Sequence, residues 1–316
     1  MNTNLSDNNG SHRHEGSHHD HSAGMKALFF SFLLITGFMI VETAGGILSH
    51  SLALLSDAGH MLGDSISLGL SLVALVVGAK VPANNRKTFG YRRFEILAAL
   101  FNGVLLLGIS IAIIIEAISR FAHPVAVASS EMMVIAVMGL VINLIAAWLL
   151  NRSHSGENLN VKSAMMHVLG DLLGSVGAIA ASGLISLFGW QMADPMASVV
   201  VSLIIFRSGW SVAKESIDIL MESRPGDLNI SEIHDRISAV EGVKGIHDLH
   251  IWTITSGFLS LSCHLTVDDS VERDMVLKKA EQILSEYKLD HSTIQIEGCS
   301  YAYCHSDCTH QKKVLP

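Results

Sequence analysis

The pattern His-x-Leu-Gly-Asp occurs twice, at residues 60–64 and 167–171, and both copies lie inside long apolar stretches. Residues four positions apart share one face of a helix, so each copy presents an imidazole and a carboxylate in the same direction. Charged side chains are costly inside a bilayer, where they usually mark a substrate or ion pathway. One such pair could simply bond to a neighbouring helix, but two pairs with the same spacing and the same Leu-Gly flank indicate a shared site.

Six apolar stretches reach about the 20 residues that are needed to cross a bilayer. They lie at residues 25–47, 52–79, 94–118, 131–150, 163–188 and 194–213. The two that carry the repeated pattern are the least apolar, as expected if their polar faces point inward. Small residues in them would let neighbouring helices approach closely; these are Gly69, Ser71, Gly174, Ser175 and Gly177.

The remainder of the chain has the composition of a soluble domain. The whole sequence is 49% hydrophobic and only 16% charged, and this excess of apolar residues is confined to residues 25–213. Residues 214–300 predict a small two-layer α/β domain. Its helices are expected near 230–240, with Asn229 or Ser231 as cap, and near 272–287. Its strands are expected at 246–254, 259–267 and 293–297, with a turn at Ser256-Gly257.

Basic residues predict the orientation of the membrane domain. The connections after the second, fourth and sixth stretches contain Lys80, Arg86, Lys87, Arg92, Arg93, Arg152, Lys162, Lys214 and Arg224, whereas the other three connections contain only Arg120. Because cytoplasmic loops carry the excess of Lys and Arg, both termini are expected in the cytoplasm.

The terminal segments suggest weak metal binding rather than packed structure. Residues 1–24 form a polar arm that contains His12, His14, His18, His19 and His21; it should be disordered, and it serves either to collect metal or as a solvated tail. It lacks the apolar core of a signal peptide. The tail at 301–316 contains Cys and His without a strong zinc pattern. All four cysteines follow residue 213, so we expect reduced thiols, and the net charge of −8 argues against a nucleic-acid partner.

The paired residues favour a divalent transition metal. His60, Asp64, His167 and Asp171 would supply two nitrogens and two oxygens, a set that suits Zn²⁺. Two neutral imidazoles and two carboxylates cancel the charge of a divalent ion in a low dielectric, and imidazole disfavours Mg²⁺ and Ca²⁺. Metal binds only the deprotonated ligands, so a site that faces the two sides in turn could exchange metal for protons.

Asp57 lies seven residues before Asp64 and near the same helix face. It could provide a fifth oxygen, handle protons, stand at the entrance of the site, or only cap the helix.

Two other kinds of membrane protein, besides a metal exporter, could contain such His–Asp pairs. A membrane acyltransferase could use a His–Asp pair as general base, but no nucleophile or oxyanion motif accompanies the pairs. A zinc sensor would bind the metal without moving it, and flux would distinguish it from a transporter.

Four segments resemble the cation diffusion facilitator family, most closely its zinc-exporting bacterial members. They are residues 51–64 (SLALLSDAGHMLGD), 88–95 (TFGYRRFE), 167–171 (HVLGD) and 247–252 (HDLHIW). The resemblance extends over about residues 25–300, in order.

The resemblance implies a non-enzymatic secondary transporter without an organic cofactor. It would be an α-helical membrane protein with six transmembrane helices, followed by a small cytoplasmic α/β ferredoxin-like domain at residues 214–300. It would form a homodimer in the inner (plasma) membrane and would exchange Zn²⁺, and also Cd²⁺, for protons. His60, Asp64, His167 and Asp171 would form its transport site. Cytoplasmic zinc sites map to His247, His264 and Glu297, with His234 as a further candidate; alternatively, His247 and His264 are strand residues that face solvent or a dimer seam. Some members carry a further site between the second and third spans, but residues 80–93 contain no His, Asp or Cys, so we expect none here.

Overall fold

The computed structural model describes the backbone of residues 18–80, 87–152, 159–226, 228–255, 257–289 and 291–299. Within these ranges the side chains of residues 18–28, 71, 74–80, 146–152 and 159–171 lie outside the description. Tertiary contacts divide the chain into two units, Met1–Val76 with Ile109–Ile204, and Val77–Gly108 with Ile205–Pro316.

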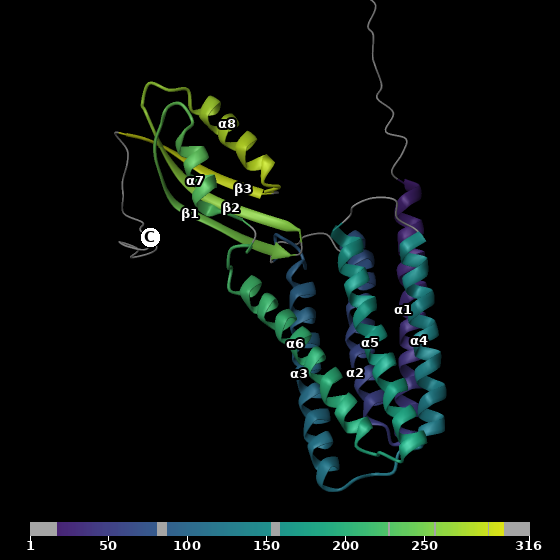
Figure 1. Ribbon diagram of the computed structural model, residues 1–316. Helices are drawn as coiled ribbons and strands as arrows, with labels where there is room; N and C mark the ends of the chain where they lie inside the picture. Colours follow the sequence, from purple (N-terminus) through teal and green to yellow (C-terminus); the bar gives the residue numbers. More distant parts are fainter. Residues whose placement is uncertain are drawn as a thin grey trace, which may run out of the picture. The chain divides into compact units, whose positions relative to one another are not determined.

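Six long helices come first in the described chain. They are α1 (His18–Ser49), α2 (Leu52–Lys80), α3 (Arg93–Ala122), α4 (Ser129–Arg152), α5 (Leu159–Phe188) and α6 (Ala193–Leu220). In the first unit α1, α2, α4 and α5 lie side by side (Figure 1). The predicted arrangement, six long helices followed by a small α/β domain, is confirmed.

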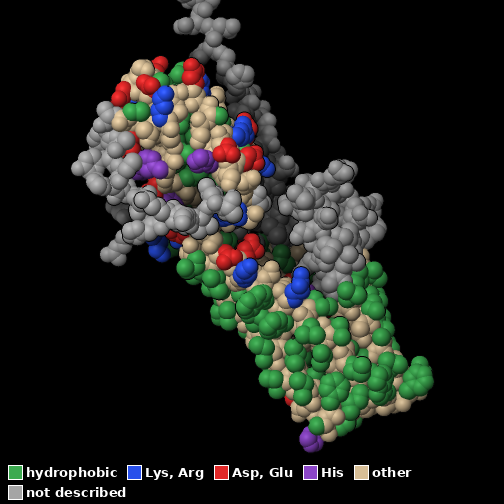
Figure 2. Space-filling view, turned by 60° about the vertical axis from the view of Figure 1, so that its left-hand side comes forward, with side chains coloured by type: hydrophobic (Ala, Val, Ile, Leu, Met, Phe, Trp, Pro, Cys, Tyr) green, Lys and Arg blue, Asp and Glu red, His purple; other side chains and the backbone are tan. Residues whose placement is uncertain are grey.

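The expectation that the two helices with the repeated pattern are the least apolar is wrong. The helix α6 is less apolar than either of them, because it extends into polar residues such as Lys214 and Glu215. Phe29–Ser49, Arg93–Ala122 and Ala193–Leu220 are long and apolar enough to cross a membrane, and Ser129–Ile145 and Leu172–Phe188 are shorter apolar segments. Within the described residues, α2 contributes no such segment and α5 only its second half. Hydrophobic side chains are exposed over the outer surface of the helices (Figure 2), as is typical of a surface that contacts lipid.

The connection between α1 and α2 is a short, fully hydrogen-bonded turn. His50 adopts the left-handed conformation, with φ of 56°. The His50 amide donates to the carbonyl of Ile47, and the Ser51 amide donates to that of Gly46. These are the two bonds of a Schellman motif, which satisfies carbonyls at the end of a helix. The two helices are therefore tightly linked.

The first helix begins earlier than the sequence suggests. The segment 1–24 is expected to be disordered, but α1 starts at His18. A helix that is stabilised by its apolar part can propagate into a polar flank, because each added residue contributes one hydrogen bond. Residues 1–17 lie outside the described part.

The α/β domain has two helices on one face of a three-stranded sheet. Its elements are α7 (Ile230–Ser238), β1 (Val243–Thr255), β2 (Phe258–Val267), α8 (Arg273–Glu286) and β3 (His291–Gly298). β1 is antiparallel to β2, β2 is parallel to β3, and the order is β1-β2-β3. The predicted order of helices and strands is confirmed.

Alternating strand residues form the core beneath the two helices. Leu261, Cys263 and Leu265 of β2 are buried against Ile233 of α7 and Val276 of α8. Because successive side chains point to opposite faces of a strand, the residues between them lie on the face that the helices do not cover. The cap of α7 is Asn229, whose side chain accepts a hydrogen bond from the Glu232 amide at 3.4 Å. The alternative cap, Ser231, lies inside the helix.

Candidate functional site

The first His-x-Leu-Gly-Asp copy lies in the interior of α2. His60 and Asp64 are partly buried and Asp57 is 4% exposed. The helix cap is Ser51, whose hydroxyl accepts a hydrogen bond from the Leu54 amide at 3.2 Å. Asp57 is thus a buried residue within the helix, one turn before His60, and its interpretation as a helix cap is wrong.

A close approach between two helices places both copies at the same height. A Cβ atom added to Gly174 of α5 would lie 2.4 Å from Oδ1 of Asp57. The predicted role of this glycine in close helix packing is confirmed, because no larger residue fits there without a shift.

The register follows from that contact, because α2 and α5 run in opposite directions (Figure 1). One residue forward along α2 then matches one residue back along α5. Three residues forward from Asp57 is His60, and three residues back from Gly174 is Asp171, so these two lie at the same height. Four residues further in each direction, Asp64 lies level with His167. The backbone of His167 and Asp171 lies on α5, but their side chains lie outside the described part, so the four-ligand site stays a prediction.

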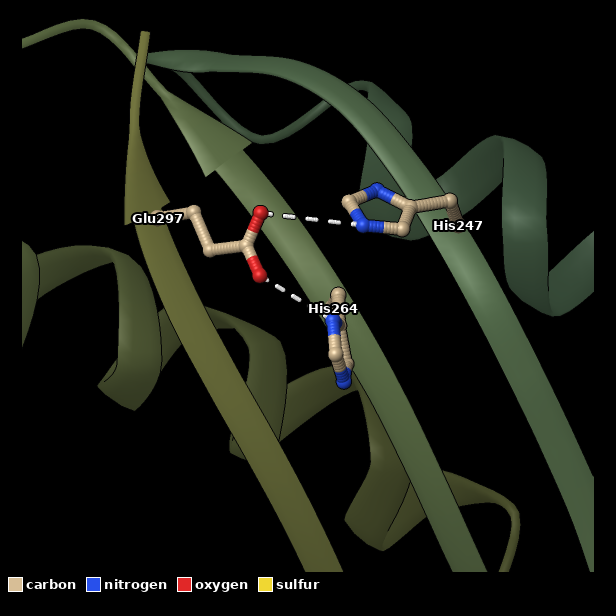
Figure 3. Close-up of side chains that lie close together, drawn as sticks. All are labelled: His247, His264 and Glu297. Carbon is tan, nitrogen blue, oxygen red and sulfur yellow. Dashed lines mark ion pairs between the residues drawn. The ribbon is translucent and has the colours of Figure 1, made fainter. Parts of the chain in front are cut away.

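A second cluster lies in the α/β domain, on the sheet face away from α7 and α8. His247, His264 and Glu297 come from three neighbouring strands, and their ligand atoms all lie within 4.8 Å of one another. Nδ1 of His264 is 3.1 Å from Oε1 of Glu297, and Nε2 of His247 is 3.7 Å from Oε2 (Figure 3). The ring centroids of the two histidines are 5.1 Å apart. The family resemblance implies these three residues as ligands, and the structure brings them together.

A β-bulge puts His247 on this face. His247 pairs with His264 and His250 pairs with Ser262, so β1 has one residue more than β2 between the two pairs. Asp248 occupies the bulge, with φ of 55°. A bulge reverses the alternation of side chains along its strand, so His247 and His250 share one face although an odd number of positions separates them. The sequence pattern does not reveal this bulge.

The cluster has the chemistry of a three-ligand metal site. Ligand atoms around a tetrahedral Zn²⁺, at bond lengths of about 2.1 Å, are about 3.4 Å apart, close to the two distances from Glu297. The Glu297 carboxylate is 6% exposed and accepts a hydrogen bond from Nε2 of Gln295 at 2.8 Å, which orients it. The two imidazoles therefore face this carboxylate rather than solvent alone.

Other candidate ligands in the domain stand apart from this cluster. His234 lies on α7, where Nδ1 is 3.2 Å from Oδ1 of Asp235. Cys263 points into the core, and burial raises the pKa of its thiol to about 11, so it stays protonated and is a poor ligand. Residues 301–316, with the Cys and His of the tail, lie outside the described residues.

Asp194, which belongs to none of the sequence motifs described above, is fully buried in the first turn of α6. Its side chain accepts hydrogen bonds from the first residues of α2. An Asp-Pro pair at the start of an apolar stretch was the signal for it, since both residues favour the first turn of a helix.

Comparison with known proteins identifies both parts of the chain. Residues 28–221 match the cation efflux transmembrane domain, and residues 225–299 match the cytoplasmic domain of cation efflux proteins. A Bacillus subtilis protein named cadmium, cobalt and zinc/H(+)-K(+) antiporter is 51% identical over 89% of this chain and 92% of its own length. The zinc transporter ZitB of Escherichia coli is 41% identical over 94% of this chain and 95% of its own length.

Solved structures also match this chain. One of them is the metal-bound C-terminal domain of the CzcD transporter from Cupriavidus metallidurans, with 42% identity over 22% of this chain and 99% of that chain, and a TM-score of 0.22. The family matches themselves span the membrane part and the cytoplasmic part in order, and the resemblance drawn from the four sequence segments is confirmed. The chain belongs to the cation efflux family, also called the cation diffusion facilitators.

Proposed function

We propose that this protein exports Zn²⁺, and Cd²⁺ by the same route, from the cytoplasm in exchange for protons. It is a transporter rather than an enzyme, as are its relatives, which are named as antiporters and zinc transporters. The transport site is formed by His60 and Asp64 of α2 with His167 and Asp171 of α5. The observation that carries the proposal is the register of the two helices, in which the Asp57–Gly174 contact sets the two pairs level with each other.

The ligand set accounts for the exchange of metal for protons. Moving one charge against the membrane potential costs about 2.3 kcal/mol per 100 mV, so exporting Zn²⁺ from a negative cytoplasm costs about twice that. One proton that returns on the emptied ligands halves this cost, and each unit of pH difference supplies about 1.4 kcal/mol more. Because the ligands bind either metal or protons, the competition itself couples the two movements.

Asp57 serves this site as an accessory group. It is buried, one turn before His60, and directly against the backbone of α5. A carboxylate in that place stabilises positive charge that arrives nearby, whether a metal ion or a proton carries it.

The cytoplasmic cluster binds a second Zn²⁺ through His247, His264 and Glu297. Its two nitrogens and one buried carboxylate leave a fourth position open. The protein works as a homodimer in the inner membrane with both termini in the cytoplasm, and the basic residues of the connections support this orientation.

The experiment is zinc flux into proteoliposomes under an imposed pH gradient. The wild type is compared with Asp171→Ala and with Asp235→Ala, which removes an exposed carboxylate of α7 as a matched control. We expect gradient-dependent flux in the wild type and the control, and none in Asp171→Ala. Undiminished flux in Asp171→Ala would contradict the site, and zinc binding without flux in the wild type would favour a sensor.

A further inference from the structure

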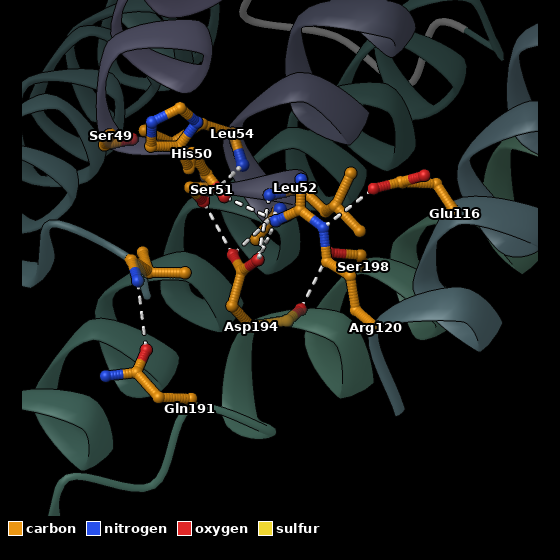
Figure 4. A network of polar contacts seen from close by, with 12 residues as sticks. Ser49, His50, Ser51, Leu52, Leu54, Glu116, Arg120, Gln191, Asp194 and Ser198 are labelled. Carbon is orange, nitrogen blue, oxygen red and sulfur yellow. Dashed lines mark hydrogen bonds and ion pairs between the residues drawn. The ribbon is translucent and has the colours of Figure 1, made fainter. Parts of the chain in front are cut away.

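The N-terminus of α2 is capped by a side chain from another helix. Asp194 of α6 accepts hydrogen bonds at Oδ2 from the amide of Leu52, at 2.8 Å, and at Oδ1 from the amide of Ala53, at 3.1 Å (Figure 4). Oδ1 also accepts a hydrogen bond from the hydroxyl of Ser51 at 2.6 Å. One carboxylate thus satisfies the first two amides of α2 and holds the residue that caps the third.

The charge of Asp194 is compensated from three sides. The carboxylate is fully buried, and a buried charge is costly unless it is paired and hydrogen-bonded. It lies at the N-termini of both α2 and α6, where helix dipoles favour a negative charge. Nη1 of Arg120 from α3 is 3.8 Å from Oδ2, and the same guanidinium donates to the carbonyl of His50. The network therefore joins α2 to both α3 and α6.

The cap determines the position of the transport residues along the helix axis. Relative to Leu52, His60 and Asp64 lie about 12 and 18 Å along α2, at 1.5 Å per residue. A helix transmits a shift or rotation at its end to residues two or three turns away, because its backbone bonds make it stiff. A metal site tolerates only a small shift or rotation of its ligands, since metal–ligand distances must stay within about 0.2 Å of their ideal values.

We infer that Asp194 is a positioning residue for the metal site. It fixes the height and rotation of α2, so that His60 and Asp64 stay level with Asp171 and His167. This inference rests on the proposed function, because it concerns the same four ligands.

The test uses the full-length protein with three variants. Asp194→Asn keeps the shape and one acceptor oxygen but removes the charge, and Ser51→Ala removes one of the bonds to Asp194. Ser198→Ala is the matched control, because the hydroxyl of Ser198 donates to the backbone carbonyl of Asp194, at 2.7 Å, and not to α2. All three positions are buried.

Two readouts separate positioning from general stability. The first is the zinc flux of proteoliposomes, analysed for KM and for maximal rate per folded protein. The second is the visible absorption spectrum of bound Co²⁺. All proteins for this measurement also carry His264→Ala, which removes a ligand of the cytoplasmic cluster. The spectrum of each variant is corrected by subtracting the spectrum of the same variant with Asp64→Ala added.

We expect Asp194→Asn to raise the KM for zinc about tenfold or more, as is typical when a residue that orients metal ligands is lost, and to shift the Co²⁺ bands. Ser51→Ala should change the KM and the Co²⁺ bands in the same direction but by a smaller amount. Ser198→Ala should match the wild type in both quantities. If Asp194→Asn fails to fold, the comparison of Ser51→Ala with Ser198→Ala tests the inference. The inference is overturned if Asp194→Asn and Ser51→Ala match Ser198→Ala in KM and spectrum. Flux that persists in Asp64→Ala would instead overturn the proposed function.

Discussion

Replacing Gly174 with alanine should separate α2 from α5 at the height of the proposed transport site. The added Cβ would lie 2.4 Å from Oδ1, 2.9 Å from Cγ and 3.2 Å from Oδ2 of Asp57. An ordinary contact of this kind is about 3.5 Å, so the helices must move apart by about 1 Å or the carboxylate must leave its place. Overpacking of this kind costs about 1–3 kcal/mol, and alanine regains about 1 kcal/mol of helix propensity over glycine. The net destabilisation is then about 0–2 kcal/mol.

The effect on transport should exceed the effect on stability. A shift of about 1 Å is several times the tolerance of a metal–ligand distance, which is about 0.2 Å. We therefore expect the KM for zinc to rise about tenfold or more, with a fall in melting temperature of only a few degrees. Zinc flux into proteoliposomes and thermal unfolding of the purified protein measure the two effects.

Gly177 provides the matched control. It lies three residues further along α5, and a Cβ atom there would meet nothing within 4 Å. Gly177→Ala should leave flux unchanged and stabilise the protein by up to about 1 kcal/mol. The reasoning is refuted if Gly174→Ala and Gly177→Ala behave alike in flux and in melting.

Three further predictions concern the cytoplasmic domain. Glu297→Gln should weaken Zn²⁺ binding at the cytoplasmic cluster by about tenfold or more, because the carboxylate faces both imidazoles. Titration calorimetry measures the loss, with His264→Ala as the control that lacks one imidazole ligand. Equal affinity in the wild type and Glu297→Gln would contradict the site. Burial raises the pKa of the Cys263 thiol to about 11 from 9.0. Between pH 9 and pH 11 the thiol therefore stays protonated in the folded state but has lost its proton in the unfolded state. The free energy of unfolding should fall there by about 1.4 kcal/mol per pH unit as the pH rises. Urea unfolding of Cys263→Ala should lack this fall. Asn229→Ala should cost about 1 kcal/mol in urea unfolding, whereas Ser231→Ala should cost little, and the reverse order would contradict the assigned cap.

Much of the fold follows from local patterns in the chain. The order of elements in the α/β domain was predictable, because strand residues such as Leu261 and Leu265 alternate and a cap such as Asn229 precedes a helix. The bulge at Asp248 was not, because a bulge arises from pairing with β2 and leaves no periodic signal in β1 itself. The start of α1 at His18 was missed for a similar reason, since composition does not show how far a stable helix extends.

The chemistry of the proposed transport site was visible in residue types and spacing, because an imidazole and a carboxylate four positions apart share a helix face in any context. The three cytoplasmic candidates followed only from the family resemblance. The heights of the ligands were not visible. They depend on Gly174, which lets α5 approach Asp57, and on Asp194, which caps α2 from another helix. By itself the sequence determined the helical membrane domain, its family and the identity of its candidate ligands. Only the tertiary structure decided their register and the grouping of His247, His264 and Glu297, because contacts between distant segments depend on how helices and strands pack.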